Sequence, residues 1–189
     1  VRPGMWAQAD SFVRRLRFRR LQFGQFLGRQ DTGGDPPRRA AEFDAGQRPF
    51  RIPYGGSNPT GAAAYAYAFL ELMEQIDPPD YIVHATSSGG TQAGMLAGAS
   101  IAGYPGRIIG ISVGPAQDAL SAEVHELANE VCDLLGTTNE VATADIYIVD
   151  DYVGGGYGVM GEAEIEAIRT LADLEGMVVD PVYTGRCVN

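Results

Sequence analysis

The sequence predicts an α/β fold in which helices flank a doubly wound parallel sheet. Short runs rich in β-branched residues alternate with longer helix-forming segments, which is the pattern of a parallel sheet. Several segments end at glycine or proline, where helices commonly stop. Apolar residues make up 45% of the 189-residue chain, a composition typical of a globular domain with a buried core.

The first half of this pattern lies between residues 61 and 113. Gly61 to Ile76 is rich in Ala, Leu, Glu and Met and predicts a helix, which the Asp-Pro-Pro-Asp segment 77–80 ends. Tyr81 to Ala85 is a short apolar run and predicts a buried strand. Residues 91–102 predict a closely packed helix of small residues, and residues 107–113 (RIIGISV) predict a second strand.

The second half begins with an amphipathic helix that carries Cys132 in its core-facing side. Apolar residues recur there at three- and four-residue intervals, namely at Leu120, Val124, Leu127, Val131 and Leu134. Asp118 is the candidate N-cap of this helix and Gly136 the candidate C-cap.

Two further strands, over residues 146–149 and 177–179, are predicted on either side of a last helix. That helix covers residues 162–175 and ends at Gly176. Its inward-facing residues are expected to be Ile165, Ile168 and Ala172.

Charge is distributed unevenly along the chain. Residues 1–51 hold 11 Arg against 5 acidic residues, whereas residues 52–189 hold 3 Arg against 19 acidic residues. The Arg-rich stretch 13–20 fits a solvated helix face or an anion- or nucleic-acid-binding arm, and the first is favoured because no basic-aromatic module is present. Segment 31–37 (DTGGDPP) predicts a loop. The acidic remainder argues against nucleic acid as the main partner.

Composition also argues against other classes of protein. No apolar run reaches eighteen residues, so no membrane span is predicted. Cys132, Cys187, His84 and His125 do not have the spacing of metal ligands, and two cysteines fit a reducing, cytoplasmic compartment. All 14 basic residues are Arg, so chemistry that needs a lysine amine is closed to this chain alone.

Segment 86–91 (TSSGGT) lies between a predicted strand and a predicted helix. Gly89 and Gly90 allow successive backbone N–H groups to face one point, while Ser87, Ser88 and Thr91 add hydroxyl donors. The following helix presents the positive end of its dipole to the same point. The segment therefore predicts a phosphate-binding loop, although a glycine turn that only connects two elements is the alternative. It matches neither the Walker loop nor the dinucleotide fingerprint, so we expect a smaller phosphate-bearing ligand.

Two other predicted strand ends carry unusual sequences, 150–158 (DDYVGGGYG) and 180–185 (DPVYTG). Parallel sheets bind ligands beyond the carboxyl ends of their strands, so both segments are candidate site loops. Segment 53–61 (PYGGSNPTG) opens a predicted helix, and helix capping explains it as well as ligand binding does.

Four blocks of the sequence, in this order, resemble the D-cysteine desulfhydrase and 1-aminocyclopropane-1-carboxylate deaminase family. They are IPYGGSN (52–58), TSSGGTQAG (86–94), DDYVGGGYGV (150–159) and EGMVVDPVYTG (175–185). The resemblance implies the tryptophan-synthase-β-like (type II) fold of pyridoxal-phosphate enzymes. It covers residues 46–189, for which we expect a cofactor-binding domain, whereas residues 1–45 match poorly and are expected to be irregular.

The resemblance implies a role for each matching residue. Ser88, Gly89, Gly90 and Thr91 would hold the phosphate of pyridoxal phosphate. Tyr157 would lie close to the substrate and Tyr183 beside the cofactor ring, both as catalytic residues, and Thr184 would face the pyridine nitrogen.

The sequence departs from the family at two positions and matches one of its branches at a third. Ser87 replaces a glycine, and serine tolerates a positive φ less well. Thr184 matches the desulfhydrase branch, whereas the deaminases place glutamate there. Arg186 stands where the family has lysine.

The resemblance also implies parts that this chain lacks. The family's Schiff-base lysine and its Ser-Asn segment for the substrate carboxylate lie upstream of the GGSN block and have no counterpart here. We therefore expect a fragment, truncated at both ends relative to the family and inactive alone, of a cytoplasmic, homodimeric lyase.

We expect the parent enzyme to convert D-cysteine, a small amino acid, into pyruvate, ammonia and sulfide by α,β-elimination. The alternatives are a 1-aminocyclopropane-1-carboxylate deaminase, an L-cysteate sulfo-lyase, or a lysine-free module that binds a phosphorylated ligand without catalysis.

Overall fold

A computed structural model describes residues 53–189 of the chain. These residues belong to a single unit of the chain, Arg51–Asn189. The predictions for residues 1–45, including the Arg-rich stretch 13–20 and the loop 31–37, lie outside the described residues. The predicted domain limit between residues 45 and 46 stays a prediction.

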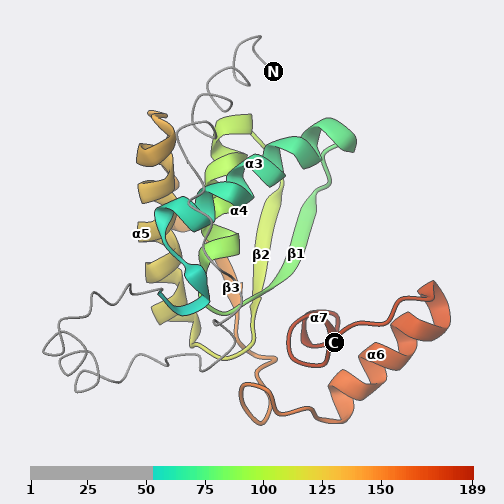
Figure 1. The fold of residues 1–189 in the computed structure, drawn as a ribbon. Helices are drawn as coiled ribbons and strands as arrows, with labels where there is room; N and C mark the ends of the chain where they lie inside the picture. The colour runs from blue at the N-terminus through green and yellow to red at the C-terminus, as the bar shows by residue number, and fades with distance from the viewer. Residues whose placement is uncertain (1–52) are drawn as a thin grey trace, which may run out of the picture. The chain divides into compact units, whose positions relative to one another are not determined.

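Helices and strands alternate along the described part, as the sequence predicts (Figure 1). Their order is η2 (Tyr54–Gly56), α3 (Pro59–Gln75), β1 (Tyr81–Thr86), α4 (Gly90–Ala102), β2 (Arg107–Ser112), α5 (Gln117–Leu135), η3 (Thr143–Asp145), β3 (Tyr147–Val149), α6 (Glu162–Glu175) and α7 (Thr184–Cys187).

The three strands form one parallel sheet in the order β1-β2-β3. Thr86 pairs with Ser112 and Ile111 pairs with Val149, so the strands end at the same edge of the sheet. The segments that follow β1 and β3 therefore start from one edge, where such sheets bind ligands.

Helices α3, α4 and α5 share a single apolar core with β2 and β3 (Figure 1). Phe69, Leu120 and Ile148 are among its buried members, and Cys132 is 2% exposed, which confirms it as a core residue. The contact between α3 and α4 is close because α4 carries glycine there. A Cβ atom at Gly98 would lie 2.7 Å from the carbonyl oxygen of Ala66.

The N-cap of helix α5 lies two residues before the predicted one, so that prediction is wrong. The N-cap is Ala116, which offers no side-chain hydrogen bond, and Asp118 lies in the first turn. The Gln117 N–H instead donates to the carboxylate of Asp150 at 2.8 Å. The first turn is thus satisfied from a distant segment, while Gly136 ends the helix at φ 68° as predicted.

The strand predicted near the C-terminus does not form. Residues 177–179 form no strand, and Val178 is 86% exposed. A strand needs a neighbour to pair with, and in the described part this segment pairs with none of the three strands of the sheet. Helix α6 ends at Gly176 as predicted.

The buried residues of α6 differ from those predicted. They are Glu164 and Ala167, whereas Ile165, Ile168 and Ala172 are only partly buried. Among the described helices, none combines the length and apolarity needed to cross a membrane.

Candidate functional site

The serine–glycine loop, residues 86–91, connects β1 directly to α4. Gly89 adopts the left-handed conformation with φ 74° and is the N-cap of α4, without a side-chain cap. The first N–H groups of a helix have no acceptor within it, so those of α4 remain available to a ligand. No acidic residue lies in its first turn. The site residues Ser88, Gly89, Gly90 and Thr91 are therefore contiguous at a helix N-terminus that favours an anion.

The second glycine loop, residues 54–58, packs directly against the serine–glycine loop. Ser57 Oγ donates to Ser88 Oγ at 2.8 Å, and the hydroxyls of Tyr54 and Ser87 share a hydrogen bond of 3.1 Å. The two loops approach so closely that a Cβ atom at Gly90 would lie 2.5 Å from Ser57 Oγ. Together they form a cradle of hydroxyl groups and helix N–H groups.

Sequence reasoning left segment 53–61 open between capping and binding, and the structure shows both kinds of contact. Asn58 is the N-cap of α3, and its side chain accepts a hydrogen bond from the Gly61 N–H at 2.8 Å. Tyr54 and Ser57 reach the serine–glycine loop and were missed as candidate site residues. The IPYGGSN block was the signal that could have found them.

The serine–glycine loop turns two residues after Ser87. The left-handed residue is Gly89, which the family motif also has. Ser87 is 9% exposed and is held through its hydroxyl by Tyr54.

Tyr157 and Tyr183 come together although 26 positions separate them. Their hydroxyls are 2.9 Å apart, and their rings meet edge to face with centroids 6.1 Å apart. The hydrogen bond with Tyr157, then burial and the nearby charges of Tyr157, Tyr54 and Asp180, raise the pKa of Tyr183 well above its usual range.

Asp180 organises the turn that carries Tyr183 and Thr184. Its carboxylate accepts hydrogen bonds from the N–H groups of Val182, Tyr183 and Thr184 at 2.7 to 2.9 Å. Burial alone would raise the pKa of Asp180, but these N–H donors together hold it below its usual value. Thr184 begins α7 with its N–H used in this way.

Arg186 is completely buried and ion-pairs with Glu164, the Nε to Oε1 distance being 2.9 Å. Its guanidinium also donates to the carbonyl oxygens of Val113, Gly156 and Val159. The Gly161 N–H, followed by Arg186, lowers the pKa of Glu164 despite its burial. Sequence reasoning noted the arginine but assigned it no contact, because its partners lie 22 or more positions away.

Comparison with known proteins identifies the family. A family model described as pyridoxal-phosphate dependent enzyme matches residues 30–188. The chain belongs to this family.

Relatives within the family are similar over most of this chain. It is 38% identical over 146 residues to the D-cysteine desulfhydrases of Salmonella schwarzengrund and Salmonella typhi, which covers 76% of this chain and 44% of each relative. A crystal structure of an ACC deaminase homologue is similar with a TM-score of 0.69 and 36% identity, covering 79% of this chain and 46% of that one. The chain thus spans less than half the length of these relatives. The predicted α/β fold and pyridoxal-phosphate cofactor are confirmed.

The cradle fits the phosphate of this family's cofactor. It offers hydroxyls, uncapped helix N–H groups and no carboxylate, and a side chain at Gly90 would fill it. The chain contains no lysine, so it holds no residue that could attach the cofactor covalently.

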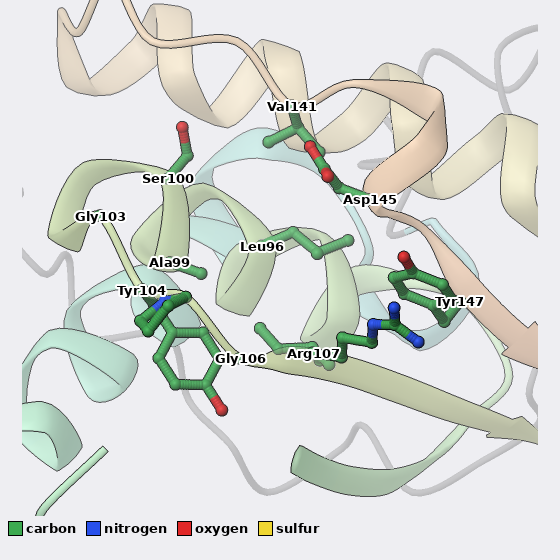
Figure 2. A pocket seen from close by; sticks show the side chains of 12 residues that line it. Leu96, Ala99, Ser100, Gly103, Tyr104, Gly106, Arg107, Val141, Asp145 and Tyr147 are labelled. Carbon is green, nitrogen blue, oxygen red and sulfur yellow. The ribbon is translucent and has the colours of Figure 1, made fainter. Parts of the chain in front are cut away.

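A cavity of about 290 Å³ lies at the opposite edge of the sheet (Figure 2). Arg107, which begins β2, lines it with its guanidinium 5.0 Å from the centroid of the Tyr147 ring. The serine–glycine loop follows Thr86 at the other end of the strands. The cavity is therefore separate from the cradle.

Other titratable groups do not form a second site. In residues 53–189, no three His, Cys, Asp or Glu side chains gather in a way that could hold a metal ion. Burial lowers the pKa of His84 on β1 to about 4, although its Nδ1 bonds the Ala85 carbonyl. His84 is thus a neutral side chain at physiological pH.

Proposed function

We propose that the full-length protein containing this chain is a pyridoxal-phosphate-dependent lyase that eliminates the β-substituent of D-cysteine. Its products are pyruvate, ammonia and sulfide. The observation that carries the proposal is Thr184 in the segment DPVYTG, in a chain 38% identical to curated D-cysteine desulfhydrases.

In this proposal the cradle holds the cofactor by its phosphate. Ser88, Gly89, Gly90 and Thr91 surround the phosphate, and the N-terminus of α4 favours its charge. When bound, pyridoxal phosphate supplies an electron sink for the charge left on the substrate Cα. The Thr184 hydroxyl would bond the pyridine nitrogen without the counter-charge that a carboxylate would supply, so the sink would be weaker.

The tyrosine pair handles protons near the substrate. The hydrogen bond with Tyr157 is the largest cause that raises the pKa of Tyr183, so Tyr183 keeps its proton. In this proposal Tyr157 is the partner that exchanges a proton with the substrate. Tyr157 is 47% exposed, so a substrate can reach it.

The lysine that attaches the cofactor comes, in this proposal, from a segment outside the chain. The 189-residue chain alone therefore gives no turnover, because all its basic residues are Arg. It is the negative control for the full-length protein.

The test uses purified full-length protein, the absorbance of bound pyridoxal phosphate, and pyruvate and sulfide assays with D-cysteine. We expect cofactor absorbance and both products in equal amounts. Tyr157→Phe should lower kcat about 100-fold and leave cofactor binding intact, as for loss of a proton-transfer group. Tyr152→Phe, at another exposed tyrosine of the same connection, is the matched control. Absence of bound cofactor contradicts the proposal.

Deamination of 1-aminocyclopropane-1-carboxylate is the second candidate, favoured by the similarity to the ACC deaminase homologue. It would give a four-carbon oxo acid and ammonia without sulfide. Release of that acid from the cyclopropane substrate, with no pyruvate from D-cysteine, would select it. Thr184 favours the first candidate because the resemblance places glutamate there in the deaminases.

A further inference from the structure

The glycine-rich segment 154–160 carries Tyr157 with little backbone structure of its own. Gly154, Gly156 and Gly158 have φ values of 60°, 119° and 75°, which glycine adopts readily. Most of the segment is exposed, and it contains neither helix nor strand. Contacts from other segments are therefore needed to hold the Tyr157 hydroxyl in one place.

Arg186 provides contacts on both sides of Tyr157. Its guanidinium donates to the Gly156 carbonyl at 3.2 Å and to the Val159 carbonyl at 2.7 Å. A third bond, of 3.2 Å, reaches the Val113 carbonyl just beyond β2. One side chain therefore ties the glycine-rich segment to the carboxyl edge of the sheet.

The backbone that Arg186 contacts at Val113 also lies beside Tyr157. Gly114 follows Val113, and a Cβ atom built on it would lie 3.6 Å from the Tyr157 Cβ. Tyr157 thus rests on the backbone that Arg186 holds. Arg186 itself lies three positions after Tyr183, on the short helix α7. Arg186 therefore connects the segment that carries Tyr157 to α7, the helix that follows Tyr183.

In this chain the contacts use a guanidinium, at a position where the resemblance places lysine in the family. The planar guanidinium of Arg186 makes four polar contacts. Three are hydrogen bonds to backbone carbonyl oxygens, and the fourth is the ion pair with Glu164. A lysine ammonium is a point charge with three donors and cannot reproduce this geometry. Glu164 in turn accepts the Gly161 N–H at 2.8 Å, which anchors the far end of the segment.

We propose that Arg186 is a positioning residue that holds Tyr157 in hydrogen-bond contact with Tyr183. Its effect on turnover rests on the proposed function, but its effect on the tyrosine pair does not.

The experiment compares Arg186→Lys with Arg169→Lys in the full-length protein. Arg169 is an exposed arginine on α6 and serves as the matched control. Isotope-labelled tyrosine, with the Tyr183 signal assigned by Tyr183→Phe, follows ionisation by NMR at about pH 10, where ordinary tyrosines titrate.

We expect Tyr183 to stay protonated in the unmodified protein and in Arg169→Lys. In Arg186→Lys, Tyr183 should ionise at a pH lower by at least about one unit. Tyr157→Phe should cause a shift in the same direction. The groups that face Tyr183 are Tyr157, Tyr54 and Asp180, and Arg186→Lys changes none of them directly. We also expect about tenfold lower kcat with a smaller change in KM.

A lowered Tm with an unmoved Tyr183 signal would show that Arg186 only stabilises the fold, and would overturn the proposal. If Arg186→Lys does not fold, Glu164→Gln decides: it should shift Tyr183 in the same direction, and an unmoved signal refutes the inference. Absence of turnover in the unmodified protein would refute the proposed function while the NMR result still tests Arg186.

Discussion

The cradle and the tyrosine pair are built in different ways. The cradle consists of two glycine loops pressed together, and glycine is required because a Cβ at Gly55 would overlap Ser88 and one at Gly90 would overlap Ser57. The tyrosine pair lies on exposed segments and is held by the charged side chains Arg186 and Asp180. Close packing fixes the first, and hydrogen bonds to charged groups fix the second.

The difference teaches which variants should affect which region. Added volume should damage the cradle, since it would displace the serine hydroxyls that form the site. Removed charge should damage the tyrosine pair, because a carboxylate or guanidinium there satisfies several backbone groups at once. Substitutions of each kind can confirm or break this comparison.

The largest expected effect comes from Gly94→Val on α4. A Cβ at Gly94 would overlap the Ala62 carbonyl oxygen and lie 2.7 Å from the Tyr65 Cβ, so α3 and α4 must separate. We expect the free energy of unfolding to fall by about 3 kcal/mol, as for severe overpacking. Urea denaturation of the full-length protein measures it. Cofactor binding should weaken as well, because the loop with Ser57 leads directly into α3.

Ala64→Val is the matched control, since Ala64 is an exposed residue of α3. It should cost only about 0.5 kcal/mol, the difference in helix propensity. Equal losses in the two variants would mean that the contact between the helices does not depend on glycine, which would break the first half of the comparison.

Asp180→Asn should have a smaller effect, on the tyrosine side. Both carboxylate oxygens of Asp180 accept backbone N–H groups, whereas an amide offers one acceptor oxygen. We expect a loss of about 1–2 kcal/mol in unfolding free energy at neutral pH. Because the turn carries Tyr183, the raised pKa of Tyr183 should fall towards its usual value as well.

The pH dependence gives a second check on Asp180. Its folded-state pKa is depressed, so its stabilisation is present above the ordinary aspartate pKa of about 4 and is lost as the pH falls through the folded value. The stability difference between Asp180→Asn and the unmodified protein should therefore shrink in acid. Asp173→Asn, at an exposed position of α6, is the matched control for the change from a carboxylate to an amide.

The same contrast explains what could be predicted from the sequence. The serine–glycine loop is local: strand, turn and helix follow one another, so residues 86–91 could be interpreted without distant contacts. The sequence left the role of Tyr54 and Ser57 open. Asn58 is a helix cap, and capping explained the segment as well as ligand binding did. The resemblance supplied the tyrosines, and their 2.9 Å contact came only with the structure.

The buried pair of Arg186 and Glu164 could not be predicted from the pattern. Apolar periodicity on α6 predicts inward-facing isoleucines, whereas the structure buries a carboxylate that has a partner 22 positions away. Likewise, the β-prone residues 177–179 form no strand, since strand formation depends on a neighbour and not on local preference alone. Asp118 failed as an N-cap for the same reason, because Asp150 arrives from elsewhere.

The smallest expected effect comes from Ser87→Gly, which restores the family's usual residue in the loop. The left-handed position is Gly89, so the change should leave the loop path intact while removing the Tyr54–Ser87 hydrogen bond. We expect about 1 kcal/mol less stability, from the lost bond and the freer unfolded chain, and a cofactor Kd within about threefold.

Tyr54→Phe is the matched variant, because it removes the same bond without touching the loop backbone. A double-mutant cycle of the two changes separates the bond from the backbone effect. A cofactor Kd raised about tenfold or more by Ser87→Gly alone would mean that the Ser87 hydroxyl holds the phosphate. The set Ser88, Gly89, Gly90 and Thr91 would then be incomplete, and the cradle would depend on a polar side chain as the tyrosine pair does.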